Sequence, residues 1–134
     1  MATDQTGDRR RARVLVVDDD LACRILAALL LEKAGHSPTA VATVARALER
    51  FDDDGADLVL TDLTLPGESG LDLLLGLRER RSATPVIVMT GSDDVELIAR
   101  ALELGATTVL RKPYSSKWLE AAVGEALGGL PAAA

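Results

Sequence analysis

Short apolar runs alternate along the chain with longer segments in which apolar residues recur at helical spacing. The apolar runs have the composition of buried strands and cover residues 14–17, 58–60, 86–89 and 109–110. A further strand is expected between Gly35 and Thr43, where Pro38 indicates an edge strand because proline has no N–H to donate to a neighbour. We therefore expect five strands in one sheet.

The segments between these strands have the pattern of helices, and five helices are expected to begin near residues 20, 44, 71, 92 and 115. Strands that alternate with helices predict βαβ units and a parallel sheet. Because the strand segments are apolar throughout rather than alternating, both faces of the sheet should be covered. The pattern predicts a doubly wound α/β domain.

The chain has 134 residues, enough for one domain, and a formal net charge of −6. This charge argues against direct nucleic-acid binding by the domain, because such binding requires a basic surface. No apolar segment is long enough to cross a membrane, and residues 1–13 lack the pattern of a signal peptide. Cys23 is the sole cysteine, which is typical of a reducing compartment, so a cytoplasmic protein is expected. His36 follows a glycine that ends a helix and is expected at the surface.

Polar residues follow four of the predicted strands. Three consecutive aspartates, 18–20, come after the first strand, and the later strands end at Asp62, Thr90 and Lys112. The carboxyl ends of parallel strands meet at one edge of a sheet, so these side chains should converge. Carboxylates are ligands that Mg²⁺ prefers, and a hydroxyl with an ammonium can hold the oxygens of a phosphoryl group. Asp20, directly before the first helix, is expected to cap it.

Together these segments resemble the receiver domain of two-component response regulators. "VLVVDDD" is similar to the acidic pair of that family, "TDLTLPGESG" to its phosphoacceptor loop, "VMTG" to its hydroxyl position and "RKPY" to its Lys-Pro-aromatic segment. The resemblance covers residues 12–128 and implies a flavodoxin-like (βα)5 domain with strand order 2-1-3-4-5. Residues 1–11 would then be a flexible tail, and residues 129–134 a tail or the start of a linker.

The resemblance implies a role for each residue at the strand ends. Asp62 would accept a phosphoryl group from a histidine kinase or a histidine phosphotransfer protein. The implied Mg²⁺ ligands are the carboxylates of Asp18, Asp19 and Asp62 and the backbone carbonyl of Thr64. Asp19 would be the more direct ligand of the acidic pair, and Thr90 and Lys112 would bind the phosphoryl group. In this family the peptide before the matching proline is often cis, which makes Lys112–Pro113 a candidate.

Other positions would tune or transmit the signal. Thr64 and Ser92 occupy two variable positions that in this family set the lifetime of the acyl phosphate. Val109 stands where many receivers have an aromatic residue that reports on the state of the hydroxyl position, so the chain departs from the family pattern here. Trp118 suits a partner surface, with packing against the Lys112–Pro113 segment as the alternative.

Phosphorylation would switch a docking face formed by the fourth helix, the fifth strand and the fifth helix. The face would serve a downstream protein target or an output domain of the same protein, and it is also compatible with a phosphorylation-dependent dimer. Such a receiver takes part in its own phosphorylation and dephosphorylation, and no separate substrate turnover is expected.

Two other functions are left open by the residues. A phosphatase of the haloacid dehalogenase type also begins with Asp-x-Asp, which Asp18 and Asp20 fit, and would use Asp18 as its nucleophile. Against it, the acidic pair 93–94 precedes Lys112 rather than following it, and Asp62 would have no role. The other alternative is a phosphorylation-independent binding module, which predicts no Mg²⁺-dependent change.

Overall fold

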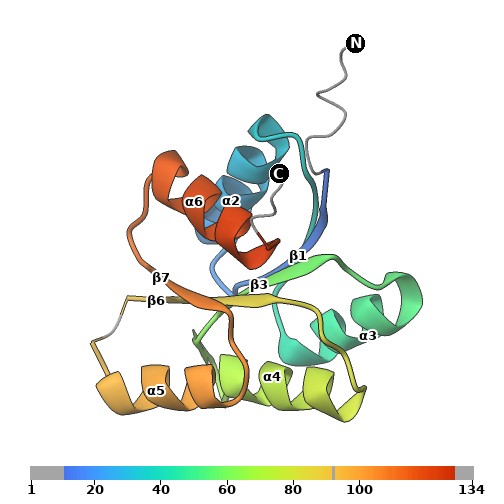
Figure 1. Cartoon of the computed structure of the whole chain (residues 1–134), viewed down its shortest axis with the longest axis vertical. Helices are drawn as coiled ribbons and strands as arrows, with labels where there is room; N and C mark the ends of the chain where they lie inside the picture. Colours follow the sequence, from blue (N-terminus) through green and yellow to red (C-terminus); the bar gives the residue numbers. More distant parts are fainter. Residues whose placement is uncertain (1–10, 92, 129–134) are drawn as a thin grey trace.

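The centre of the molecule is a sheet of five parallel strands (Figure 1). The structure is a computed structural model and describes residues 11–91 and 93–128. The strands of this sheet are β1 (Arg13–Val17), β2 (Ser37–Val41), β3 (Leu58–Asp62), β6 (Val86–Thr90) and β7 (Thr108–Arg111). Their order is β2-β1-β3-β6-β7, which counted along the chain is 2-1-3-4-5, as expected. Pro38 lies on the edge strand β2, where its missing N–H interrupts no inner ladder.

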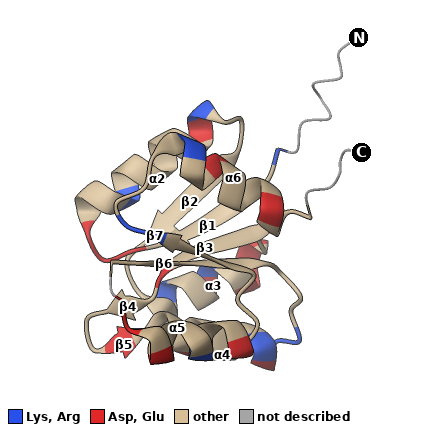
Figure 2. Cartoon of the chain, turned by 60° about the vertical axis from the view of Figure 1, so that its left-hand side comes forward, with Lys and Arg blue, Asp and Glu red and all other residues tan. Residues whose placement is uncertain are grey.

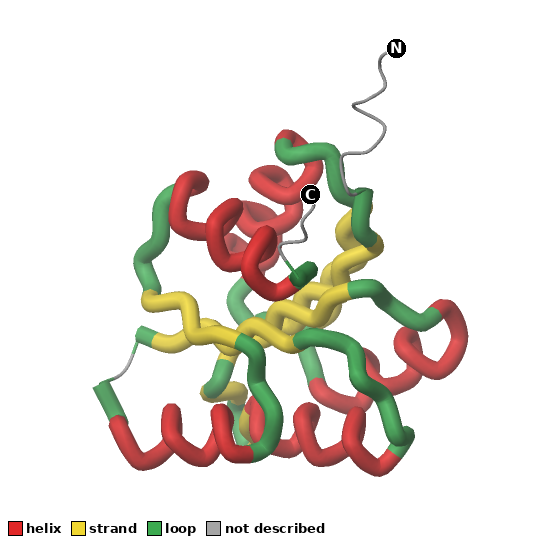
Figure 3. The backbone as a smooth tube through the Cα atoms, in the orientation of Figure 1, coloured by secondary structure: helices red, strands yellow, loops and turns green. Residues whose placement is uncertain are grey.

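Helices cover both faces of the sheet in the described part of the chain. They are α2 (Leu21–Lys33), α3 (Val44–Asp54), α4 (Gly70–Glu79), α5 (Val95–Glu103) and α6 (Ser116–Ala126). Figure 3 shows α2 and α6 on one face and α3, α4 and α5 on the other. Successive residues of a strand face opposite sides, so Leu58 and Leu60 pack beneath α2 and α6 while Val59 packs against α3 and α4. Both faces are buried, which explains the uninterrupted apolar strands.

A small antiparallel hairpin follows β3 and was not predicted. It consists of β4 (Thr64–Leu65) and β5 (Glu68–Ser69), joined by Pro66 and Gly67. Gly67 has a φ of 71°, a conformation that glycine adopts without strain. Two-residue strands are too short to leave a periodic pattern in the sequence, and only the Pro-Gly turn marked the segment.

The helix starts are set by side-chain caps. Asp20 caps α2 as predicted, since its Oδ2 accepts a hydrogen bond from Cys23 N at 2.9 Å. Ser115 caps α6 by accepting from Trp118 N. The expectation that the fourth helix starts at residue 92 is wrong: α5 begins at Val95 because the Asp94 carboxylate accepts from Leu97 N.

His36 is not the plain surface residue that the sequence suggested. Its ring is half-buried and Nδ1 accepts a hydrogen bond from Ala12 N at 3.0 Å, which ties the entry to β1 to the start of β2. This contact joins residues that are 24 positions apart, so no local pattern could have shown it. Among the described residues, no helix has the length and apolar character needed to cross a membrane.

Candidate functional site

The polar residues at the strand ends converge at one edge of the sheet. Asp18 directly follows β1, Asp62 ends β3, Thr90 ends β6 and Lys112 directly follows β7. Figure 2 shows the acidic loop before α2 and the basic segment after β7 at this same edge. The parallel register brings these ends together, and Lys112 N donates to the carbonyl oxygen of Thr90 at 2.8 Å. The predicted convergence is therefore present.

Three carboxylates gather at this edge. Asp18, Asp19 and Asp62 each offer an oxygen, and these atoms all lie within 4.8 Å of one another. Asp18 is buried, Asp62 is half-buried and Asp19 is exposed. Lys112 bridges two of them: Nζ lies 2.8 Å from Asp18 Oδ2 and 3.2 Å from Asp62 Oδ2. The lysine thus offsets part of the repulsion among the acids.

The three acids differ in what holds them. Asp18 uses both oxygens, because Oδ1 accepts from Asp20 N at 3.0 Å and Oδ2 accepts from Lys112. Asp62 Oδ1 faces the hairpin and accepts from Thr64 N at 3.4 Å, while Oδ2 faces Lys112. Within residues 11–91 and 93–128, no hydrogen-bond donor or cation is in contact with the Asp19 carboxylate.

The surroundings of Asp62 and Lys112 shift the pKa values of both residues. Burial raises the pKa of Asp62, the charge on Lys112 opposes this shift, and the charge on Asp18 adds to it. Burial also opposes the charge on Lys112, but the hydrogen bond and charge of Asp18, together with those of Asp62, raise the pKa of Lys112 well above its usual value. Lys112 therefore remains protonated, whereas keeping Asp62 ionised is unfavourable for the free energy of the folded state.

These donors suit a hard divalent cation. Mg²⁺ prefers oxygen ligands and keeps several waters, so a few carboxylates are sufficient. Among the described residues the Asp19 carboxylate has no donor on it, and Asp62 Oδ1 has only the long 3.4 Å contact with Thr64 N, whereas both Asp18 oxygens accept hydrogen bonds of 3.0 Å or less. The cluster could hold such a metal mainly through Asp19 and Asp62, with Asp18 in support.

The chain matches a known family over most of its length. The model of the response regulator receiver domain matches residues 14–124. The chain belongs to this family. Receiver domains are signalling modules that bind Mg²⁺ through an acidic pocket, and response regulators interact with histidine kinases and output domains.

Relatives of this receiver domain include longer regulators. Sensory transduction protein RegX3 of Mycobacterium tuberculosis is 44% identical over 110 residues, which cover 82% of this chain and 48% of that protein. Transcriptional regulatory protein FixJ of Azorhizobium caulinodans is 41% identical over 115 residues, which cover 86% of this chain and 54% of FixJ. The chain thus spans about half the length of these curated relatives.

Solved structures show the same fold. NtrX from Brucella abortus is similar with a TM-score of 0.85 and 30% identity, covering 90% of this chain and 27% of that chain. A response regulator receiver domain protein from Clostridium thermocellum has a TM-score of 0.82 and 29% identity, covering 88% of this chain and 95% of that chain.

The remaining predicted positions of the receiver domain are placed as follows. Thr64 lies exposed on β4, and Val109 on β7 is half-buried against the core beneath α5. Ser92 lies outside the described residues. The Lys112–Pro113 peptide is cis, as expected. Trp118 is 68% exposed and borders a pocket of about 280 Å³ that Pro113 also lines.

Two residues to which the sequence interpretation gave no role in the site help to build it. A Cβ at Gly70 would lie 2.6 Å from the carbonyl oxygen of Asp62, so the start of α4 approaches the end of β3 too closely for a side chain. Arg24, on α2, donates to the carbonyl oxygens of Asp18 and Asp19. Gly70 could have been suspected from the loop motif, whereas nothing local in the sequence marks Arg24.

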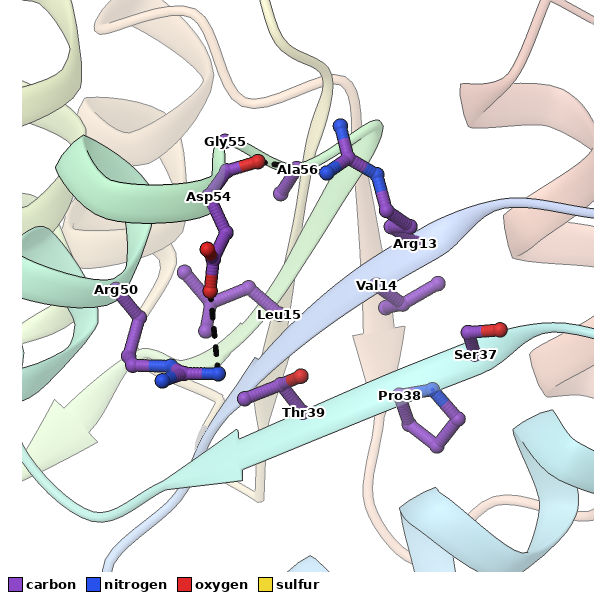
Figure 4. Close-up of a pocket in the computed structure, with 10 residues that line it drawn as sticks. All are labelled: Arg13, Val14, Leu15, Ser37, Pro38, Thr39, Arg50, Asp54, Gly55 and Ala56. Carbon is purple, nitrogen blue, oxygen red and sulfur yellow. Dashed lines mark hydrogen bonds and ion pairs between the residues drawn. The ribbon is translucent and has the colours of Figure 1, made fainter.

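A second polar pocket lies toward the amino ends of β1 and β2 and is not part of this site (Figure 4). Its volume is about 240 Å³, and Arg13 and Arg50 stand at its rim. Both guanidinium groups are already engaged. Arg50 pairs with the Asp54 carboxylate at 3.2 Å, and Arg13 donates to the Asp54 carbonyl oxygen at 2.6 Å.

Proposed function

We propose that the receiver domain accepts a phosphoryl group on Asp62 from a phosphohistidine of a histidine kinase or a histidine phosphotransfer protein, in a Mg²⁺-dependent reaction. The observation that carries this proposal is the set of contacts around Asp62. Asp62 stands at the end of β3 with one oxygen on Lys112 and the other toward the hairpin, beside two further carboxylates.

Phosphoryl transfer requires little of the protein beyond positioning the reacting groups and stabilising their charge. An Asp62 oxygen attacks phosphorus, the P–N bond to the donor histidine breaks, and the imidazole leaves with the bonding electron pair. Lys112 holds one of the phosphoryl oxygens as an ion pair, and the Thr90 hydroxyl donates to another. Asp18 and Asp19, with Asp62 and the backbone carbonyl of Thr64, would hold Mg²⁺, which neutralises charge on the phosphoryl group when it is bound.

The proposed output is a change at the face formed by α5, β7 and α6. Large apolar side chains are exposed there, with Val95 at 75%, Leu102 at 48% and Trp118 at 68% exposure. Thr90 connects the site to this face, because it ends β6 next to β7 in the sheet. Phosphorylation would bias two arrangements of the face and so favour a target protein, an output domain or a second copy. Thr64 and Ser92 would tune the lifetime of the modification.

The proposed domain spans residues 12–128, with tails on either side, and works in the cytoplasm. The extent agrees with the family match at residues 14–124 and with the elements from β1 to α6. A phosphatase with Asp18 as nucleophile fits the site less well. Asp18 is 1% exposed, so a substrate phosphorus atom cannot reach its carboxylate, whereas Asp62 is only half-buried.

The experiment is to locate the modified carboxylate. Wild-type protein is incubated with acetyl phosphate, with and without MgCl₂, and its intact mass and peptide masses are measured. Asp62→Asn should abolish the added phosphoryl mass, and the wild type should gain it only with Mg²⁺. The control Asp53→Asn changes an exposed carboxylate on α3 and should react like the wild type. Label on Asp18 would support the phosphatase instead, and no Mg²⁺-dependent change would support the binding module.

A further inference from the structure

Arg24 contacts the backbone of the acidic pair rather than its carboxylates. This half-buried residue lies in the first half of α2, and its guanidinium reaches back to the loop that follows β1. The single atom Nη1 donates to the carbonyl oxygen of Asp18 at 2.9 Å and to that of Asp19 at 3.1 Å. Two consecutive carbonyls are therefore held on one donor.

This arrangement fixes the direction in which the Asp19 side chain leaves the backbone. The two carbonyls belong to the peptide units before and after the Asp19 Cα, so a donor that holds both sets the backbone dihedrals at this residue. The Cα–Cβ bond of Asp19 then has one direction. For Asp18 the same task is done by its own carboxylate, which is held by Asp20 N and Lys112.

Asp19 has no such side-chain support. No donor or cation among the described residues contacts its carboxylate, which is exposed to solvent. Its position relative to Asp18 and Asp62, within 4.8 Å, thus depends on the backbone that Arg24 holds. We infer that Arg24 is a positioning residue for the metal site, and that it acts by aiming the Asp19 carboxylate at Asp62. This inference rests on the proposed function.

The charge on Arg24 and its hydrogen bonds predict opposite results when the residue is replaced. A cation close to a Mg²⁺ site repels the metal, so a purely electrostatic role means that a neutral variant binds Mg²⁺ more tightly. A positioning role means that the neutral variant binds more weakly. Loss of groups that orient metal ligands lowers metal affinity by about tenfold or more.

The test is isothermal titration with MgCl₂ in the absence of any phosphodonor. Arg24→Met should raise the Mg²⁺ Kd by about tenfold. Arg24→Lys keeps the charge but carries it on a shorter side chain, whose ammonium reaches the two carbonyl oxygens less well, and should show an intermediate loss. Arg100→Met, a matched change of charge on the exposed end of α5, should leave the Kd unchanged. Urea midpoints establish that each variant is folded, and Arg24→Lys serves if Arg24→Met is not.

A double-mutant cycle shows whether Arg24 acts through Asp19. In an Asp19→Asn background, Arg24→Met should change the Kd by less than about twofold, because the positioned ligand is already lost. An unchanged or tighter Kd for Arg24→Met, or a full tenfold effect without the Asp19 carboxylate, would overturn the inference. A wild type that binds no Mg²⁺ would instead refute the proposed function itself.

Discussion

The carboxylate of Asp62 should destabilise the folded domain, so its removal should raise stability at neutral pH. Three acidic oxygens lie within 4.8 Å of one another at the strand ends. At an effective dielectric constant near 20, two unit charges at this separation repel by roughly 3.5 kcal/mol. Asp62 takes part in two such pairs, with Asp18 and with Asp19.

The attraction to Lys112 offsets most of this repulsion. With Nζ 3.2 Å from Asp62 Oδ2, the same calculation yields roughly 5 kcal/mol. The repulsions sum to roughly 7 kcal/mol on this scale, so Asp62 is left at a disadvantage of roughly 2 kcal/mol. Solvent screens the exposed Asp19, and the expected gain for Asp62→Asn is about 1 to 2 kcal/mol.

Thermal unfolding followed by far-UV circular dichroism measures this difference. In EDTA at pH 7.5, Asp62→Asn should melt about 4 to 8 °C above the wild type. This difference in melting temperature between Asp62→Asn and the wild type should narrow as the pH falls. Burial raises the pKa of Asp62 in the folded state, so the wild type takes up a proton there before the unfolded chain does and loses the unfavourable charge. Mg²⁺ should also narrow the gap, because it stabilises only the wild type strongly.

Asp53→Asn is the matched control. Asp53 is exposed on α3, and within the described part of the chain it forms no ion pair, so its replacement should leave the melting temperature nearly unchanged. An Asp62→Asn variant that is no more stable than the wild type at pH 7.5 would refute the electrostatic reasoning. An advantage that persists undiminished at low pH would point to packing instead.

Three further predictions concern the scaffold around the site. Gly70→Ala should lower the free energy of unfolding by about 1–3 kcal/mol in urea titrations and slow phosphorylation, because the new Cβ would lie 2.6 Å from the carbonyl oxygen of Asp62. Stability should fall as the pH drops below about 6.5, since burial lowers the pKa of His36 and the unfolded chain takes up the proton first; His36→Asn should flatten this part of the pH profile. Asp20→Ala should lose about 1 kcal/mol with the cap of α2 while its Mg²⁺ Kd in titration calorimetry stays close to that of the wild type.

Each of these three predictions has a control or an outcome that would contradict it. Gly124→Ala lies inside α6 with no atom within 4 Å of the added Cβ, so it should stabilise by about 0.5–1 kcal/mol. A pH profile of His36→Asn that matches the wild type would remove His36 as the titrating group. Asp19→Ala should weaken Mg²⁺ binding strongly, and an equal loss in Asp20→Ala would contradict the separation of the two roles.

The sheet and the strand-end residues were predictable because both follow from simple periodic rules. Apolar runs such as residues 86–89 predict strands buried on two faces, and parallel strands bring their carboxyl ends together. The family motifs then pointed to Asp62 and Lys112, which the structure places 3.2 Å apart. The strand ends placed Asp18 and Lys112 at the same edge, but which side chains pair there is set by tertiary packing, so the 2.8 Å contact between these two residues was not predictable.

The features that were not predicted are those that leave no periodic pattern of apolar residues in the sequence. The hairpin of β4 and β5 has two residues in each strand, and its existence depends on the turn at Pro66–Gly67. The acceptor role of the half-buried His36 depends on the backbone N–H of Ala12, which lies 24 positions earlier in the chain. Such contacts are set by tertiary packing, and a single sequence carries no repeated signal for them.

The three consecutive aspartates have different roles because each carboxylate has different contacts. Asp18 is buried, and its two oxygens are used by Asp20 N and Lys112, so it fixes the lysine and the loop. Asp20 directs its carboxylate to Cys23 N and starts α2. Asp19 is left with its carboxylate in solvent and only its backbone held, by Arg24. Because the other two acids are committed to protein contacts, Asp19 is the member of the triplet with the most coordination capacity to offer a cation.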